Sequence, residues 1–206
     1  MSRERWMALL FAVGSLCFLI GPFPGYVDLV GPGADAVTFF VGSIFFTAAS
    51  ALQFAATPRE ERADWWACVI QLAGTLFFNV STGQALAAAI RDPTELGAGW
   101  RPDAFGSVAF LISSGLAVVA TRDRGSLWDR HARSWHGTWL NMLGSIAFGV
   151  SAVGAYVSPR TDDLVSLFWA NLGTLIGALC FFVAAMLSRR AIDVDEPTAA
   201  AGSAMA

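Results

Sequence analysis

The chain carries very little charge for its length. Only 14% of its 206 residues are Asp, Glu, Lys or Arg, whereas a soluble domain usually has about 25%. Hydrophobic residues make up 55% of the chain, and the mean hydropathy is +0.56. The apolar residues fall in long blocks that contain no charged residue. This pattern excludes an ordinary soluble enzyme and a disordered protein, and it predicts an integral membrane protein.

Lysine is absent and cysteine is scarce. All 13 basic residues are Arg, and the net charge of −3 argues against a nucleic-acid partner, because phosphate binding requires a basic face. Cys17, Cys68 and Cys180 all lie in apolar blocks, where cysteine packs as a small hydrophobic residue. There is no CxxC pattern and no Cys/His pairing at zinc spacing. We therefore expect no cofactor and no metal site.

Six apolar blocks are long enough to cross a bilayer as helices, which takes about 20 residues each. Alternating strands of the barrel type do not occur, so we predict an all-α transmembrane bundle. The bundle should occupy residues 1–190, as three tandem two-helix hairpins at about 6–56, 65–120 and 139–187, followed by a disordered cytoplasmic tail over 191–206. The six blocks are 6–23, 36–56, 65–89, 104–120, 139–157 and 164–187.

The distribution of Arg predicts the orientation. Ten Arg residues lie in the N-terminal segment, the 57–64 and 121–138 loops and the tail, against three in 24–35, 90–103 and 158–163. Basic residues accumulate on the cytoplasmic side. We therefore place both termini in the cytoplasm and the protein in a bacterial plasma membrane.

Three acidic residues precede the helices that return to the cytoplasmic side. Asp35, Asp103 and Asp163 each lie directly before such a block. An Asp at this position commonly caps the helix by accepting bonds from first-turn N–H groups. We interpret the three as N-caps, and the alternative is an acidic ring at the external mouth.

A short motif recurs once in every block: Gly, then Ser or Thr, then an aliphatic residue. In the first five blocks a Phe lies four residues after the Gly. Gly and Ser or Thr let helix backbones approach closely, so we predict an internal repeat that packs the helices. The motif residues are Gly14 and Ser15, Gly42 and Ser43, Gly74 and Thr75, Gly106 and Ser107, Gly144 and Ser145, and Gly173 and Thr174.

Three stretches resemble the YrhK-like bacterial membrane proteins, which are built on Phe-rich and Gly-Ser-rich hairpins. They are Val41-Gly42-Ser43-Ile44-Phe45-Phe46, Asn141-Met142-Leu143-Gly144-Ser145 and Trp169-Ala170-Asn171-Leu172-Gly173-Thr174. The resemblance covers most of the membrane part and implies the hairpin architecture. It implies no catalytic residue, because that family has no assigned activity.

Polar groups inside the predicted spans are amides and hydroxyls. The absence of charge there disfavours an ion-coupled pump, and the absence of nucleophile–base pairs disfavours an enzyme. The amides and hydroxyls either bond between helices, at about 0.6 kcal/mol each, or line a narrow wet path for a small solute. The residues of this candidate polar pathway are Thr47, Gln71, Asn79, Asn141 and Asn171.

The segment 126–136 has the pattern of a short amphipathic helix. Trp128 and Trp135 fall on its apolar side, and Arg130 and Arg133 face away. Such a helix lies in the headgroup plane and offers Arg to anionic lipid; the alternative is a solvated connector. We predict a non-enzymatic protein that binds membrane lipid or a membrane-protein partner, including a second copy. The alternative is a passive channel or facilitative transporter for a small uncharged solute.

Overall fold

The computed structural model describes residues 2–92, 94–125, 127 and 133–203, with only the backbone for 133–134 and 190–203. Within this part of the chain all regular structure is helical, apart from one isolated bridge between Val157 and Leu164. The prediction of an all-α fold is therefore confirmed. The helices are α1 (Arg3–Ile20), α2 (Tyr26–Val30), α3 (Pro32–Ala56), α4 (Arg62–Arg91), α5 (Trp100–Asp123), α6 (Arg133–Gly154) and α7 (Leu167–Ser203).

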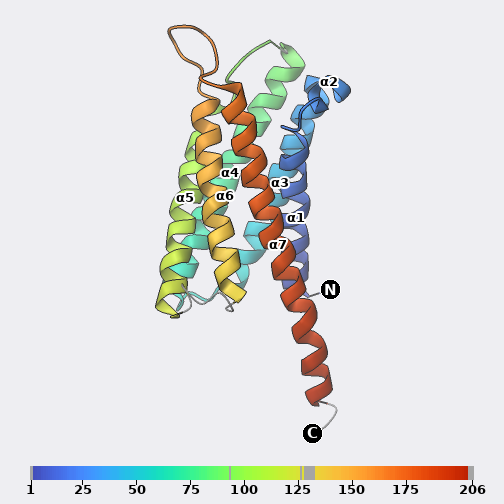
Figure 1. Ribbon diagram of the computed structural model, residues 1–206, viewed down its shortest axis with the longest axis vertical. Coiled ribbons are helices and arrows are strands. Elements are labelled where there is room, and N and C mark those ends of the chain that lie inside the picture. The colour runs from blue at the N-terminus through green and yellow to red at the C-terminus, as the bar shows by residue number, and fades with distance from the viewer. Residues whose placement is uncertain (1, 93, 126, 128–132, 204–206) are drawn as a thin grey trace.

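The six long helices form a closed ring. Each packs against the helices before and after it in chain order, and α7 returns to pack against α1. The short α2 packs on α3 beside the start of that helix (Figure 1). We call the end where α3, α5 and α7 begin the distal end, and the end with both chain termini the termini end.

The chain beyond the bundle continues α7. The sequence predicts disorder over 191–206, whereas the backbone is helical up to Ser203. The segment is rich in alanine, with Ala199, Ala200 and Ala201 in succession. Alanine has the highest intrinsic helix propensity, which favours this continuation.

Three of the helices, α3, α5 and α7, are long and apolar enough to cross a membrane. The sequence predicts six such spans. Mean hydropathy is reduced by Arg3, Glu4 and Arg5 in the first turn of α1, and by Gln71 and Asn79 on α4. Three apolar helices within the described residues thus support the prediction of a membrane protein.

The N-cap prediction for the acidic residues is wrong. Gly31 caps α3 and Gly99 caps α5, with φ angles of 84° and 81° that favour glycine. Asp35 and Asp103 therefore lie inside the helices, in the first turn. Asp163 lies in the exposed loop before α7. The first turn of α7 is instead capped by Ser166, whose hydroxyl oxygen accepts a hydrogen bond from the Trp169 N–H at 3.3 Å.

Glycines bring neighbouring helices to backbone contact. A Cβ on Gly14 would lie 3.0 Å from the Gly42 carbonyl oxygen, and one on Gly106 would lie 3.1 Å from that of Gly74. A side chain at Gly14 or Gly106 would therefore push α1 from α3, or α4 from α5, by a few tenths of an ångström. It is the close small-residue packing typical of membrane helices.

On α7 this register belongs to Gly177 rather than to the motif glycine Gly173. A Cβ on Gly177 would lie 3.1 Å from the Gly144 carbonyl oxygen, and Phe181 follows four residues later. Gly173 packs even more tightly, with its Cβ position 2.6 Å from the Ala147 carbonyl oxygen. Both Gly173 and Gly177 of α7 thus pack closely against α6, and the Phe of the Phe plug follows Gly177.

Six phenylalanines, one from each long helix, fill the centre of the ring. Their side chains are 3–7% exposed and form one buried cluster, which we call the Phe plug. Neighbouring rings pack with centroids 5.1–6.4 Å apart, within the range of favourable edge and offset contacts. The residues are Phe18, Phe46, Phe78, Phe110, Phe148 and Phe181.

Candidate functional site

A cavity opens at the distal end, directly above the Phe plug. Its volume is about 390 Å³, within the range of about 300–1,000 Å³ that is common for small-molecule sites. Phe18, Phe78 and Phe148 of the Phe plug line its inner end. We call this space the distal cavity.

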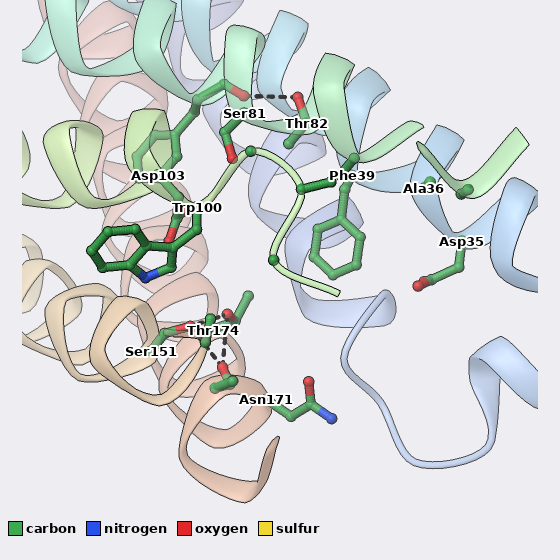
Figure 2. Close-up of a pocket in the computed structure, with 18 of the residues that line it drawn as sticks. Asp35, Ala36, Phe39, Ser81, Thr82, Trp100, Asp103, Ser151, Asn171 and Thr174 are labelled. Atoms are coloured by element: carbon green, nitrogen blue, oxygen red, sulfur yellow. Dashed lines mark hydrogen bonds between the residues drawn. The ribbon is translucent and has the colours of Figure 1, made fainter. Parts of the chain in front are cut away.

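Two carboxylates line the distal cavity from different helices. In Figure 2, Asp35 of α3 lies on one side, and Asp103 and Trp100 of α5 lie on the other. Asn171 of α7 lies between them along the wall. The first turns of the three distal helices thus converge on one space, which the sequence could not show because their separation along the chain is large.

Neither carboxylate has a partner within the described chain. The Asp35 Oδ1 atom is buried without a hydrogen bond. Asp103 is half-buried, and its carboxyl group has no hydrogen bond or ion pair among the described residues. No Arg lines the cavity. Two carboxyl groups therefore face a shared space in which no Arg lies to balance a charge on them.

Three of the four hydroxyl groups that line the cavity, those of Thr82, Ser151 and Thr174, are already bonded. The Ser151 and Thr174 hydroxyl oxygens lie 2.7 Å apart, as Figure 2 shows, and each also lies within hydrogen-bond distance of the Ala170 carbonyl oxygen. Thr82 donates to the Phe78 carbonyl at 2.8 Å. The Ser151 bonds link α6 to α7 and the Thr82 bond lies within α4, and these bonds leave the three hydroxyls little capacity for a ligand. Among the described residues of the lining, the polar side chains without a hydrogen bond are the two carboxyls, the Ser81 hydroxyl and the Asn171 amide.

Trp100 and a tight loop hold the α5 side of the cavity. The Trp100 indole N–H donates to the Ala152 carbonyl of α6 at 2.8 Å, and its ring packs on Tyr156. Gly97 and Gly99 have φ angles of 73° and 81°. A Cβ on Gly99 would lie 2.3 Å from the Ser81 carbonyl oxygen, so only glycine lets this loop close against α4.

A smaller cavity of about 100 Å³ lies at the termini end. Gln71 and Asn141 line it, together with Phe181 of the Phe plug. Gln71 approaches Gln53 at 3.5 Å, and Ser113 donates to the Ala67 carbonyl at 2.8 Å. The amides there lie on the opposite side of the Phe plug from the distal cavity.

The candidate polar pathway is divided between these places. Gln71 and Asn141 lie in the cavity of the termini end, and Asn171 lies in the distal cavity. Thr47 bonds the Ser43 carbonyl of its own helix at 3.1 Å, and Asn79 lines neither cavity. The structure does not bring the five residues together, and the Phe plug lies between the two groups.

Most of the predicted lipid-contact segment lies outside the described residues. This applies to Trp128 and Arg130, and for Arg133 only the backbone is described, as the first residue of α6. Trp135 lies in the first turn of α6, where its ring packs on His136 with centroids 4.8 Å apart. The amphipathic-helix prediction stays a prediction.

The lining of the distal cavity combines two carboxyl groups with aromatic rings. Within the described residues there is no group of three or more His, Cys, Asp or Glu that could hold a metal ion. Two carboxylates beside aromatic rings instead match a positively charged organic group. The sequence analysis names Asp35 and Asp103 as N-caps, with an acidic ring as the alternative, because the predicted spans begin just after them.

Comparisons with known protein families, with characterised sequences and with solved structures find no match. The function of the site is therefore argued from its own geometry.

Proposed function

We propose that the chain is a non-enzymatic membrane protein that binds a lipid-derived ligand in the distal cavity. The observation that carries this proposal is the pair Asp35 and Asp103, which face one cavity without a partner in the described chain. Ionisable groups within membrane helices are costly, and those that occur commonly serve ligands, ions or protons. Bound ligand would offset that cost.

The proposal includes six spans arranged as three hairpins in a bacterial plasma membrane, with both termini in the cytoplasm. The contact between α1 and α7, which closes the ring, supports the six spans. Because α1, α4 and α6 pack beside the three apolar helices in this ring, they would lie at the same depth in the membrane. The excess of Arg at the termini end supports the orientation. The resemblance to YrhK-like proteins agrees with this arrangement.

The alternative function, a passive path for a small uncharged solute, is supported less well. Cavities at both ends of the ring would suit such a path, but the Phe plug fills the space between them. A solute would have to displace several packed rings. Ligand binding from the distal side requires no such movement.

The segment 126–136 is proposed as an additional lipid contact. Arg130 and Arg133 would lie at the cytoplasmic surface in the proposed orientation. Each Arg near an anionic surface contributes about 1 kcal/mol of attraction. A membrane-protein partner or a second copy of the chain remains the alternative to lipid here.

Filling the distal cavity tests the proposed function. Ala85 of α4 lines the cavity, whereas Ala87 lies on the exposed face of the same helix. Ala85→Trp is expected to abolish ligand retention, because the indole would occupy the space of the ligand. Mass spectrometry of molecules that co-purify with each variant in nanodiscs measures this.

The matched variant Ala87→Trp adds the same side chain outside the cavity and should retain the ligand as the unsubstituted protein does. Equal retention by both variants, or no retained molecule in any of them, would contradict the proposed function. Equal thermal unfolding temperatures establish that both variants are folded.

A further inference from the structure

An apolar groove opens from the side of the distal cavity. Its volume is about 620 Å³, and it lies between the α1–α2 connection and the beginning of α7. Asp35 and Asn171 line both the groove and the distal cavity, so the two spaces meet at these residues. The other groove residues are almost all apolar: Gly21, Pro22, Phe23, Pro24, Gly25, Val27, Phe39, Leu167, Phe168, Leu172 and Leu175.

The groove lies at the contact between α1 and α7, where the first and last helices of the chain meet. Hydroxyl pairs bridge α3 to α4, through Ser43 and Thr82 at 2.9 Å, and α5 to α6, through Ser114 and Ser145 at 2.7 Å. On α1 the Ser15 hydroxyl is buried without a partner in the described chain. Among the described residues, no hydroxyl pair of this kind joins α1 to a neighbouring helix.

We infer that the distal cavity and this groove together bind a single-chain cationic amphiphile from the membrane. The inference rests on the proposed function and names the ligand class. The ammonium head lies between Asp35 and Asp103, and the alkyl chain lies in the groove against Leu172 and Leu175.

The charge of the site decides the headgroup. The carboxylates attract a cation, and the aromatic rings of Phe39 and Trp100 suit an alkylammonium by cation–π attraction. A phosphate-bearing headgroup would meet two carboxylates and no Arg in the lining. A phospholipid head is therefore disfavoured, and so is a neutral one, which would leave the carboxylates uncompensated.

The shape of the site decides the tail. The groove is apolar and leaves the cavity sideways rather than along the axis of the ring, because the Phe plug closes the inner end. Phe23, Leu167 and Phe168 at its outer margin are 60–64% exposed. An alkyl chain with its head at Asp35 would thus pass from the cavity into the surrounding lipid.

The test is equilibrium binding of dodecyltrimethylammonium to the protein in phosphatidylcholine nanodiscs, with binding to empty nanodiscs subtracted. Dodecanol provides the same chain without the charge, and tetramethylammonium the head without the chain. We expect saturable binding of dodecyltrimethylammonium at least tenfold tighter than that of either comparison compound.

Two pairs of variants separate head from tail. Asp35→Asn and Asp103→Asn should each weaken dodecyltrimethylammonium at least tenfold, whereas Asp28→Asn, an exposed carboxylate on α2, should not. Leu172→Trp fills the groove and should weaken the dodecyl compound but not tetramethylammonium. Leu179→Trp, at an exposed site on α7 outside both spaces, is its control.

Each contrary outcome identifies what fails. Binding that is insensitive to both Asp substitutions, or dodecanol binding of equal strength, overturns the cationic head. Tetramethylammonium binding as tight as that of the dodecyl compound overturns the tail and leaves the cavity as a site. Absence of binding by every probe overturns the inference, while the retained-ligand comparison of Ala85→Trp and Ala87→Trp decides the proposed function separately.

Discussion

Phe148→Ala is expected to lower the free energy of unfolding by about 3–5 kcal/mol, the range for removing a buried Phe. Phe148 is 6% exposed and packs against Phe18, Phe78, Phe110 and Phe181, with ring centroids 5.7–6.4 Å apart. The substitution leaves a void inside the Phe plug, where Phe148 of α6 contacts rings from four other long helices. Unfolding in mixed micelles, followed by circular dichroism, measures the loss.

Phe105→Ala is the matched control. Phe105 is on α5 and is 61% exposed, so its removal leaves no internal void and should cost about 0.5 kcal/mol or less. A comparable loss for both variants would show that the Phe plug does not hold the ring together.

Gly173→Ala is expected to destabilise the protein by about 1–3 kcal/mol or more, the usual cost of overpacking. The new Cβ would lie 2.6 Å from the Ala147 carbonyl oxygen and 2.7 Å from the Ser151 backbone nitrogen. Backbone atoms cannot rotate away, so α6 and α7 must separate. Because Ser151 also bonds Thr174 beside the distal cavity, ligand retention should fall with the unfolding temperature.

Gly115→Ala on α5 provides the comparison, since its Cβ would meet nothing within 4 Å. There the substitution should stabilise slightly, because Ala has the higher helix propensity by about 1 kcal/mol. Two glycine substitutions of the same kind should thus shift the unfolding temperature in opposite directions. A fall of equal size at Gly115 would contradict the account of close packing at Gly173.

The sequence predicts the six long helices well because length and hydropathy are local properties. The predicted block 65–89, for example, lies within α4 (Arg62–Arg91), and 104–120 lies within α5 (Trp100–Asp123). Some of the predicted boundaries err at the distal starts. There Gly31 and Gly99 begin α3 and α5 several residues before the apolar blocks.

Those few residues carry the site, and the sequence offers Asp35 and Asp103 as N-caps or as an acidic ring without deciding between the two. The predicted spans contain no charged residue, but the observed helices include Asp35 and Asp103 in their first turns. Whether such a residue caps its helix or faces a cavity depends on how the helices are rotated in the ring. That rotation follows from packing across the whole chain, and no local pattern encodes it.

The sequence motif also does not predict which glycine of α7 precedes the Phe that enters the Phe plug. The motif requires Ser or Thr after the Gly, so it selects Gly173 with Thr174 and passes over Gly177, which is followed by Ala178. The Phe four residues after Gly177 was the available signal, and Phe181 does lie in the Phe plug. A periodicity that included the Phe would have placed this helix correctly.

The account centres on a cavity that is open to the distal side and closed to the termini side by the Phe plug. A small membrane-impermeant thiol reagent tests this directly, on single cysteines introduced after Cys17, Cys68 and Cys180 are replaced. Ala85→Cys probes the distal cavity and Asn141→Cys the cavity of the termini end. Leu29→Cys, at a site 83% exposed on α2, is the positive control.

In intact cells the reagent should label Ala85→Cys and Leu29→Cys but not Asn141→Cys, and in inside-out vesicles it should label Asn141→Cys alone. Labelling of Asn141→Cys in intact cells would mean that water passes the Phe plug. If Ala85→Cys is labelled neither in intact cells nor in inside-out vesicles while Leu29→Cys is labelled in intact cells, no open distal cavity exists. Either result would contradict the account.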